Sequence, residues 1–249
     1  FPAFFARKGI HYGWVVAGTT FLTMLVTAGA MGGPAVLLVR LQDEFGWTNS
    51  DISTALSVLI SSMMAFAFTR FEFRGREIIF RVMLIGLMVP AMMLIIPQFV
   101  LAKYFGLLDS LAGLIVFYVA GSLALNVFLL RGFFAAIPGE LDQAMQVDGA
   151  NAWTRYWRLA IPLARPALAT ATIFTFLACW DEFAWALTII NSPENRTLPI
   201  AIQLFQGQNA TQWGLVFAAS VIAVIPVIVV YLIFQRHFVQ GLTSGAVKG

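Results

Sequence analysis

The sequence contains one cysteine and two histidines in 249 residues, and few charged residues. The single thiol, Cys179, cannot form an internal disulfide, and no cysteine and histidine cluster has the spacing of metal ligands. Charged residues make up 11% of the chain, whereas 60% of its residues are hydrophobic. Soluble domains have about a quarter of their residues charged. The composition therefore excludes an ordinary water-soluble domain, and we expect no metal site.

Motifs for catalysis are also missing. His11 and His237 lie near no plausible nucleophile and orienting acid, and no glycine-rich phosphate-binding loop is present. We expect no catalytic residue and no cofactor on this chain. The net charge of +3 is small and scattered, so we expect no nucleic-acid partner.

Long hydrophobic runs dominate what remains. A helix needs about 20 apolar residues to cross the hydrocarbon core of a membrane. Six such stretches fit the sequence, so we predict an all-α polytopic membrane protein. We place the six transmembrane helices near residues 14–38, 53–70, 80–101, 109–130, 166–190 and 213–235.

The basic residues indicate an orientation. If the N-terminus is cytoplasmic and six spans follow, every basic residue except Arg40, Lys103 and Arg196 falls in an inner segment. Cytoplasmic loops are enriched in such residues. We therefore predict a multi-pass protein of the cytoplasmic (inner) membrane with both termini cytoplasmic. Residues 131–165 are then its largest extramembrane segment.

The 131–165 segment has helical periodicity on both sides of a break at Gly149. Ile137, Leu141 and Met145 repeat every four residues before it. After it, one face of a second short helix is marked by Trp153, Tyr156, Trp157, Ala160 and Ile161. We predict a helix–turn–helix at the membrane surface. It is either an interfacial hairpin that ties two spans together or a docking surface for a cytoplasmic partner.

Two further features admit a structural and a functional interpretation. Arg70, Arg74, Arg76 and Arg81 form a basic turn that is typical of a topology signal in contact with anionic membrane lipid. Prolines inside the predicted spans, at positions 90, 97 and 226, introduce kinks that either shape a pathway or only distort the packing.

Asp181 and Glu182 lie well within an apolar stretch, toward the outer end of the fifth span. Ionisable groups at that depth tend to face a bundle interior or a water-filled cavity. The neighbouring aromatic residues Trp180, Phe183 and Trp185 could stack on a sugar ring. We take these five residues as translocation-pathway candidates. The alternative is an interfacial tryptophan belt whose carboxylates reach headgroup water.

From about residue 58 to the end, the sequence resembles the permease subunits of carbohydrate ABC importers, of the maltose-permease, binding-protein-dependent type. Several motifs occur in the family's order: FEFRGR at 71–76, GLLD at 106–109, FFAAIPGEL at 133–141 and the ending QRHFVQGLTSGAVKG at 235–249. The departure is Gln143-Ala144-Met145, where the family has Glu-Ala-Ala.

The resemblance implies a type I ABC importer permease fold, with the 131–165 helix pair as its cytoplasmic coupling loop. The coupling residues that match the family pattern are Gln143, Ala144, Asp148, Gly149, Ala150, Trp153, Arg158 and Pro162. The implied partners are a second permease, two ATPase subunits that hold ATP and Mg²⁺, and an extracytoplasmic solute-binding protein. Within this family the chain would carry a sugar or polyol and would not itself be an enzyme.

Residues 1–57 differ from that pattern. The segments 10–16 (IHYGWVV) and 44–53 (EFGWTNSDIS) resemble the first helix and outer loop of a major facilitator carrier. We therefore divide the chain into an atypical segment, 1–57, and an importer domain, 58–249. Two alternatives to the importer are an ion-gradient-driven carrier acting as a homodimer, with Asp181 or Glu182 as its relay, and a non-functional fusion product.

Overall fold

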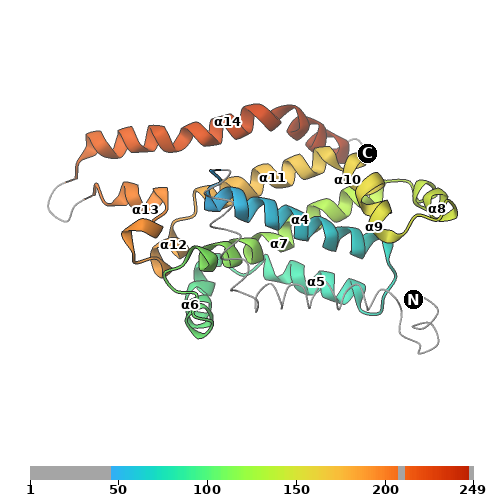
Figure 1. Cartoon of the computed structure of the whole chain (residues 1–249), viewed down its shortest axis with the longest axis horizontal. Helices are drawn as coiled ribbons and strands as arrows, with labels where there is room; N and C mark the ends of the chain where they lie inside the picture. The colour runs from blue at the N-terminus through green and yellow to red at the C-terminus, as the bar shows by residue number, and fades with distance from the viewer. Residues whose placement is uncertain (1–45, 207–210, 247–249) are drawn as a thin grey trace.

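The computed structural model of the protein describes residues 46–206 and 211–246 (Figure 1). These ranges are helical, apart from turns, loops and a single bridge between Gln206 and Thr211. The prediction of an all-α fold is confirmed. The first predicted span, 14–38, lies outside the described residues.

Three helices form the centre of the bundle: α4 (Asn49–Arg70), α7 (Leu111–Ala136) and α11 (Arg165–Trp180). They lie side by side in Figure 1, and α4 packs along much of α7. Ser53, Ser57 and Ser61 repeat every four residues on α4 and are completely buried. Small side chains at this spacing allow two helix backbones to approach closely in a membrane.

The long helix α14 (Trp213–Ala246) lies against α11 and forms the outer layer at the top of Figure 1. Only 6% of its most apolar window is buried within the described part of the chain. Many side chains between residues 213 and 233, among them Phe217, Val221 and Ile222, are exposed. This surface must be covered by lipid or by another subunit, because a helix this apolar is not stable against water.

Two predicted spans are interrupted. Residues 76–104 form α5 (Arg76–Gly86), a 3₁₀ turn η1 (Ala91–Leu94) and α6 (Ile95–Tyr104), and the chain bends by 98° between α5 and the η1–α6 segment. Pro90 precedes η1, and Pro97 lies in the first turn of α6. A proline there removes no helical hydrogen bond. The bend predicted within 80–101 is present as a break between two helices, and their crossing of the membrane as one span stays a prediction.

The predicted span 166–190 is likewise two helices. It contains most of α11 and then α12 (Ala184–Ile189), with Asp181, Glu182 and Phe183 in the break between them. Within the described residues, three helices are long and apolar enough to cross a membrane, or up to five if each bent pair is one span. The count of six spans stays a prediction.

The predicted helix pair is present at one end of the bundle. It consists of α8 (Gly139–Val147), a turn, α9 (Ala152–Arg155), a π-helical turn η2 (Tyr156–Ala160) and α10 (Ile161–Leu163). Gly149 makes the turn with φ of +79°, a left-handed conformation that favours glycine. Figure 1 shows α8 projecting beyond the right-hand end of the bundle.

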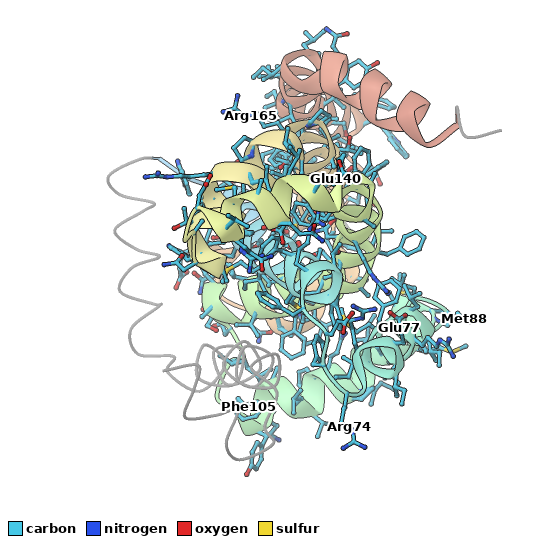
Figure 2. All side chains as sticks on the ribbon, turned by 90° about the vertical axis from the view of Figure 1, so that its right-hand side faces the viewer. Arg74, Glu77, Met88, Phe105, Glu140 and Arg165 are labelled. Carbon is cyan, nitrogen blue, oxygen red and sulfur yellow. The ribbon has the colours of Figure 1, made fainter. Side chains whose placement is uncertain are left out.

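Arginines join the helix ends at this same end of the bundle. Arg70 donates hydrogen bonds to the carbonyl oxygens of Phe134 and Ile137, at 3.1 and 2.9 Å. Arg131 pairs with Glu77 at 2.5 Å and lies over the ring of Phe80. Arg70 and Arg131 therefore hold α4, α5 and α7 together. Arg74, by contrast, points away from the bundle (Figure 2).

Asp109 organises the loops at the opposite end. Its carboxylate accepts hydrogen bonds from the backbone N–H groups of Asn191 and Ser192, both at 2.9 Å, and from the Ser192 hydroxyl. The hydroxyl bond, with the two backbone bonds, holds the pKa of the Asp109 carboxyl below its ordinary value. This residue therefore ties the loop before α7 to the loop that leads to η3 (Pro193–Asn195) and α13 (Leu198–Gln203).

Candidate functional site

The helix α8 turns most of its surface away from the rest of the chain. Of its nine residues, Asp142 alone is buried. Leu141 is 44% exposed and Val147 88% exposed. Of the predicted apolar face, Ile137 packs against the core just before α8 begins, whereas Leu141 on α8 itself is not packed as a core residue would be. Exposed apolar residues on a projecting helix form a surface that a partner can cover.

Asp142 is buried because it pairs with Arg155 of α9. The carboxylate oxygen Oδ2 lies 2.5 Å from Nη1 of Arg155 and also accepts a hydrogen bond from Gln146. Both members of the ion pair are largely shielded from water. Sequence reasoning missed this pair, because a separation of 13 residues across a turn corresponds to no single-helix periodicity.

The predicted coupling residues are mostly on the outer surface of the helix pair. Two of them, Ala150 and Pro162, are half-buried, and the exposed ones are Gln143, Ala144, Asp148, Gly149, Trp153 and Arg158. The predicted aromatic face of the second helix is divided. Tyr156 points inward and is 2% exposed, whereas Trp157 is 43% exposed.

The second region of interest is a cavity of about 360 Å³ in the other half of the molecule. Its walls come from α7, α11, the start of α12 and the segment from Leu87 to Gln98. Tyr118, Ser122 and Asn126, spaced by four residues on α7, line one wall. Residues at this spacing share one face of a helix. The cavity therefore has a polar stripe within otherwise apolar walls.

Hydrogen bonds fix the inner end of this stripe. The Asn126 amide is 2% exposed and donates to Ser57 Oγ at 3.1 Å and to Thr175 Oγ1 at 2.7 Å. The hydroxyls of Ser57 and Ser122 also bond each other. One buried amide thus connects α4, α7 and α11, and the cavity wall is held at their junction.

Glu182 and Asp181 have different surroundings. Glu182 accepts hydrogen bonds from the N–H groups of Trp185 and Ala186, at 2.7 and 3.0 Å, and from the Tyr118 hydroxyl at 3.0 Å. It therefore caps the start of α12 while lining the cavity. Asp181 is exposed and does not line the cavity. The two carboxylates do not form one site.

The predicted aromatic residues are divided in the same way. Trp185 lines the cavity, is 5% exposed and packs against Phe117 with ring centroids 4.5 Å apart. Its indole Nε1 has no hydrogen-bond partner among the described residues. Trp180 instead donates to the carbonyl of Ala223 on α14, and Phe183 packs in the core beside α12. Neither of these two lines the cavity.

Sequence reasoning thus identified Glu182 and Trp185 of the cavity wall but missed Tyr118, Ser122, Asn126 and Thr175. Hydroxyl and amide side chains do not interrupt a charge-free window, so the search for spans passed over them. The signal that could have found them is their spacing. Three polar residues recur every four positions in an otherwise apolar helix.

Comparisons with known proteins agree on one class. Residues 57–244 match the family described as binding-protein-dependent transport system inner membrane component. Three relatives are each 37% identical to this chain over 80% of its length. They are the sulfoquinovosyl glycerol transport system permease protein SmoH of Agrobacterium fabrum, the trehalose transport system permease protein SugB of Mycobacterium tuberculosis and the trehalose/maltose transport system permease protein MalG of Thermococcus litoralis. The matches cover 70%, 73% and 72% of these relatives, respectively.

A solved structure gives the same result for the fold. It is a chain of a bacterial ABC transporter involved in the import of the acidic polysaccharide alginate, with a TM-score of 0.63 and 28% sequence identity. The match covers 76% of this chain and 73% of that chain. Both the projecting helix pair and the cavity lie within the part of the sequence that the family covers.

Proposed function

The chain belongs to the family of binding-protein-dependent transport system inner membrane components, and we propose that it is the subunit that moves a carbohydrate or polyol through an ATP-driven importer. The observation that carries the proposal is the family match over residues 57–244, which contains both regions described above. The relatives SugB and MalG are named for trehalose and trehalose/maltose transport. The predicted secondary carrier would leave this match unexplained.

The helix pair α8–α10 is the docking element for an ATPase subunit in this proposal. Its exposed residues combine apolar side chains, such as Leu141 and Trp153, with charged ones such as Arg158. Glu140 lies on the end that faces the viewer in Figure 2, where a cytoplasmic subunit would approach. ATP and Mg²⁺ are held by the ATPase subunits, and this chain transmits their closure to the membrane helices.

The cavity beside α7 is one wall of the solute pathway in this proposal. Its polar groups are hydroxyls, an amide and the capped carboxylate of Glu182, beside the aromatic surface of Trp185. Hydroxyl, amide and carboxylate groups beside aromatic rings suit the hydroxyl groups and ring faces of a sugar or polyol. The unpartnered Nε1 of Trp185 is buried in this conformation, and it becomes available to donate to a solute hydroxyl when this wall opens.

A second permease completes the pathway, and an extracytoplasmic binding protein delivers the solute. The largely exposed α14 supports a neighbouring subunit or lipid on that side of the chain. The end that carries α8 and the arginine contacts faces the cytoplasm, as the distribution of basic residues predicts. Both termini are then cytoplasmic.

The ion-gradient alternative requires a titrating relay within the pathway. Asp181 lies outside the cavity, and both oxygens of Glu182 already accept hydrogen bonds. This geometry favours the ATP-driven importer.

The test is affinity purification of the tagged chain from its native membrane in mild detergent, followed by mass spectrometry of the retained proteins. We expect an ATPase subunit and a second permease to be recovered. Loss of the ATPase when exposed residues of α8 are replaced, with the chain itself at normal abundance, supports docking at this helix. Recovery of the intact chain alone, or as a homodimer, contradicts the proposed function.

A further inference from the structure

The buried ion pair between α8 and α9 has a geometry suited to more than stability. Asp142 contributes Oδ2 to the pair and Arg155 contributes Nη1, at 2.5 Å. The second carboxylate oxygen, Oδ1, and the guanidinium Nε are buried and have no hydrogen-bond partner among the described residues. A buried ion pair in which two polar atoms have no hydrogen-bond partner is weak evidence that the pair stabilises the fold, because the cost of desolvation offsets much of the electrostatic attraction. Its location suggests another role.

Little else fixes the position of α8. The helix has nine residues, and helices shorter than about 12 residues are marginal in isolation. Its apolar side chains do not pack into the core, and Asp142 is its one buried residue. The contact with Arg155 is therefore the main side-chain link that orients α8 against the rest of the chain.

On the other side of this link, the chain is tightly packed. Tyr156, next to Arg155, is 2% exposed, and its hydroxyl lies 2.7 Å from Ser62 Oγ on α4. Its ring also packs against Phe66 of α4, with centroids 5.4 Å apart. Arg155 thus stands between a projecting helix with few contacts and a buried residue anchored to the bundle.

The helix α4 leads from this anchor to the cavity. Ser57, little more than one turn from Ser62, accepts a hydrogen bond from Asn126, which lines the cavity. A displacement of α8 that is carried to Tyr156 therefore has a packed, hydrogen-bonded route to the cavity wall. Rigid elements and buried polar contacts of this kind transmit small shifts between distant sites.

We propose that Asp142 and Arg155 are the positioning pair through which displacement of α8 by the ATPase subunit reaches the transmembrane helices. This inference rests on the proposed function. Without the pair, α8 still docks on its partner, but it swings on the Gly149 turn and moves the bundle less. The pair therefore determines coupling rather than assembly.

A reporter in the cavity wall makes this measurable without knowledge of the solute. Leu125 lines the cavity and is 45% exposed, so a cysteine there can react with a maleimide. The background carries Cys179→Ala, because Cys179 is the one native thiol. The quantity measured is the ratio of Leu125→Cys labelling rates in the purified complex without and with ATP plus vanadate, which traps the closed ATPase.

The variants isolate the pair. Asp142→Asn, Arg155→Gln and the double variant remove its charges, and Asp142→Arg with Arg155→Asp exchanges them. Gln146→Ala is the matched control, because it removes a neutral hydrogen bond to the same carboxylate oxygen and leaves the pair intact. Each complex is also measured for recovery of the ATPase subunit and for thermal stability.

We expect each neutral variant to keep its ATPase subunit. The ATP-dependent labelling ratio should fall toward unity, by roughly tenfold, because the interaction energy between two contacting residues is of this size. The double variant should be no worse than either single variant, and the control should match the wild type. The exchanged variant should recover the ratio. If the exchanged protein does not reach the membrane, the double-mutant cycle of Asp142→Asn, Arg155→Gln and the double variant decides whether the two residues act as a pair.

Two results would overturn the inference. In the first, Asp142→Asn or Arg155→Gln retains the wild-type labelling ratio. In the second, the neutral variants lose the ratio only in proportion to lost ATPase recovery or stability, which indicates a purely structural role. A wild-type complex with no ATPase, or with no response to ATP, instead contradicts the proposed function and the inference together.

Discussion

Replacement of Gly149 by valine should uncouple ATP hydrolysis from movement of the bundle. Gly149 has φ of +79°, and a Cβ built on it meets no atom within 4 Å. The penalty is therefore one of backbone conformation and not of collision. A residue with a Cβ costs about 1–2 kcal/mol in the left-handed region, and β-branched residues are the least tolerant. Valine should open the turn between α8 and α9, whereas asparagine should be tolerated.

The structure offers a matched control at Gly106. This residue has φ of +67°, and the position of its absent Cβ is also open, but it lies between α6 and α7 at the end away from α8. Gly106→Val should therefore lower the stability of the complex by a similar amount, about 1–2 kcal/mol. It should leave communication between α8 and the cavity intact.

The assay compares both variants in the purified complex by thermal unfolding, ATPase recovery and the ATP-dependent labelling of Leu125→Cys. We expect similar losses of stability, with the labelling response lost in Gly149→Val, partly kept in Gly149→Asn and normal in Gly106→Val. The reasoning is refuted if Gly149→Val responds to ATP like the wild type. It is refuted equally if both valine variants lose the response together, because the effect would then be one of general destabilisation.

Three further outcomes follow from the contacts described. Asn126→Leu removes two interhelical hydrogen bonds at about 0.6 kcal/mol each, so the complex should lose about 1 kcal/mol of stability in thermal unfolding; an unchanged midpoint contradicts the network. Trp185→Phe removes an N–H with no partner in the described chain. Uptake into vesicles, measured with the sugar that is bound to the co-purified binding protein, should therefore fall while the stability of the complex is unchanged. The lowered pKa of Asp109 means that its stabilisation is complete above the ordinary aspartate value near 3.9 and is lost as the pH falls through the folded value. Asp109→Asn should therefore lower the amide-exchange protection factor of Ser192 severalfold at pH 7, whereas the wild type should lose this protection only at pH values below the ordinary aspartate pKa.

Hydrophobic runs predicted the class of fold well, because lipid imposes a simple length requirement on helices. Where the runs contained breaks, they predicted less. The run over 166–190 looked continuous apart from two carboxylates, and the structure ends α11 at Trp180 because Glu182 caps a new helix. A carboxylate that begins a helix and one that merely interrupts an apolar run have the same appearance in sequence.

Periodicity placed the helix pair correctly but did not show which residue of α8 is buried. The four-residue repeat of Ile137, Leu141 and Met145 left open whether this side meets the membrane or a partner, and the buried residue of α8 is Asp142. A repeat indicates that a helix has an apolar side, and it does not reveal whether this chain or another one covers that side. The roles of the coupling residues stay predictions for the same reason.

The π-helical turn over Tyr156–Ala160 has a consequence for how this sequence can change in evolution. A π-turn closes its hydrogen bond over one more residue than an α-turn, so it contains one residue beyond what a regular helix needs. Loss of any single residue there would leave a well-formed α-helix, but it would rotate everything before it by about 100° relative to α11. The Asp142–Arg155 pair and α8 would then turn together and lose their present orientation relative to α11. Substitutions in this segment can therefore accumulate gradually, whereas an insertion or a deletion changes the orientation of the helix pair in a single step.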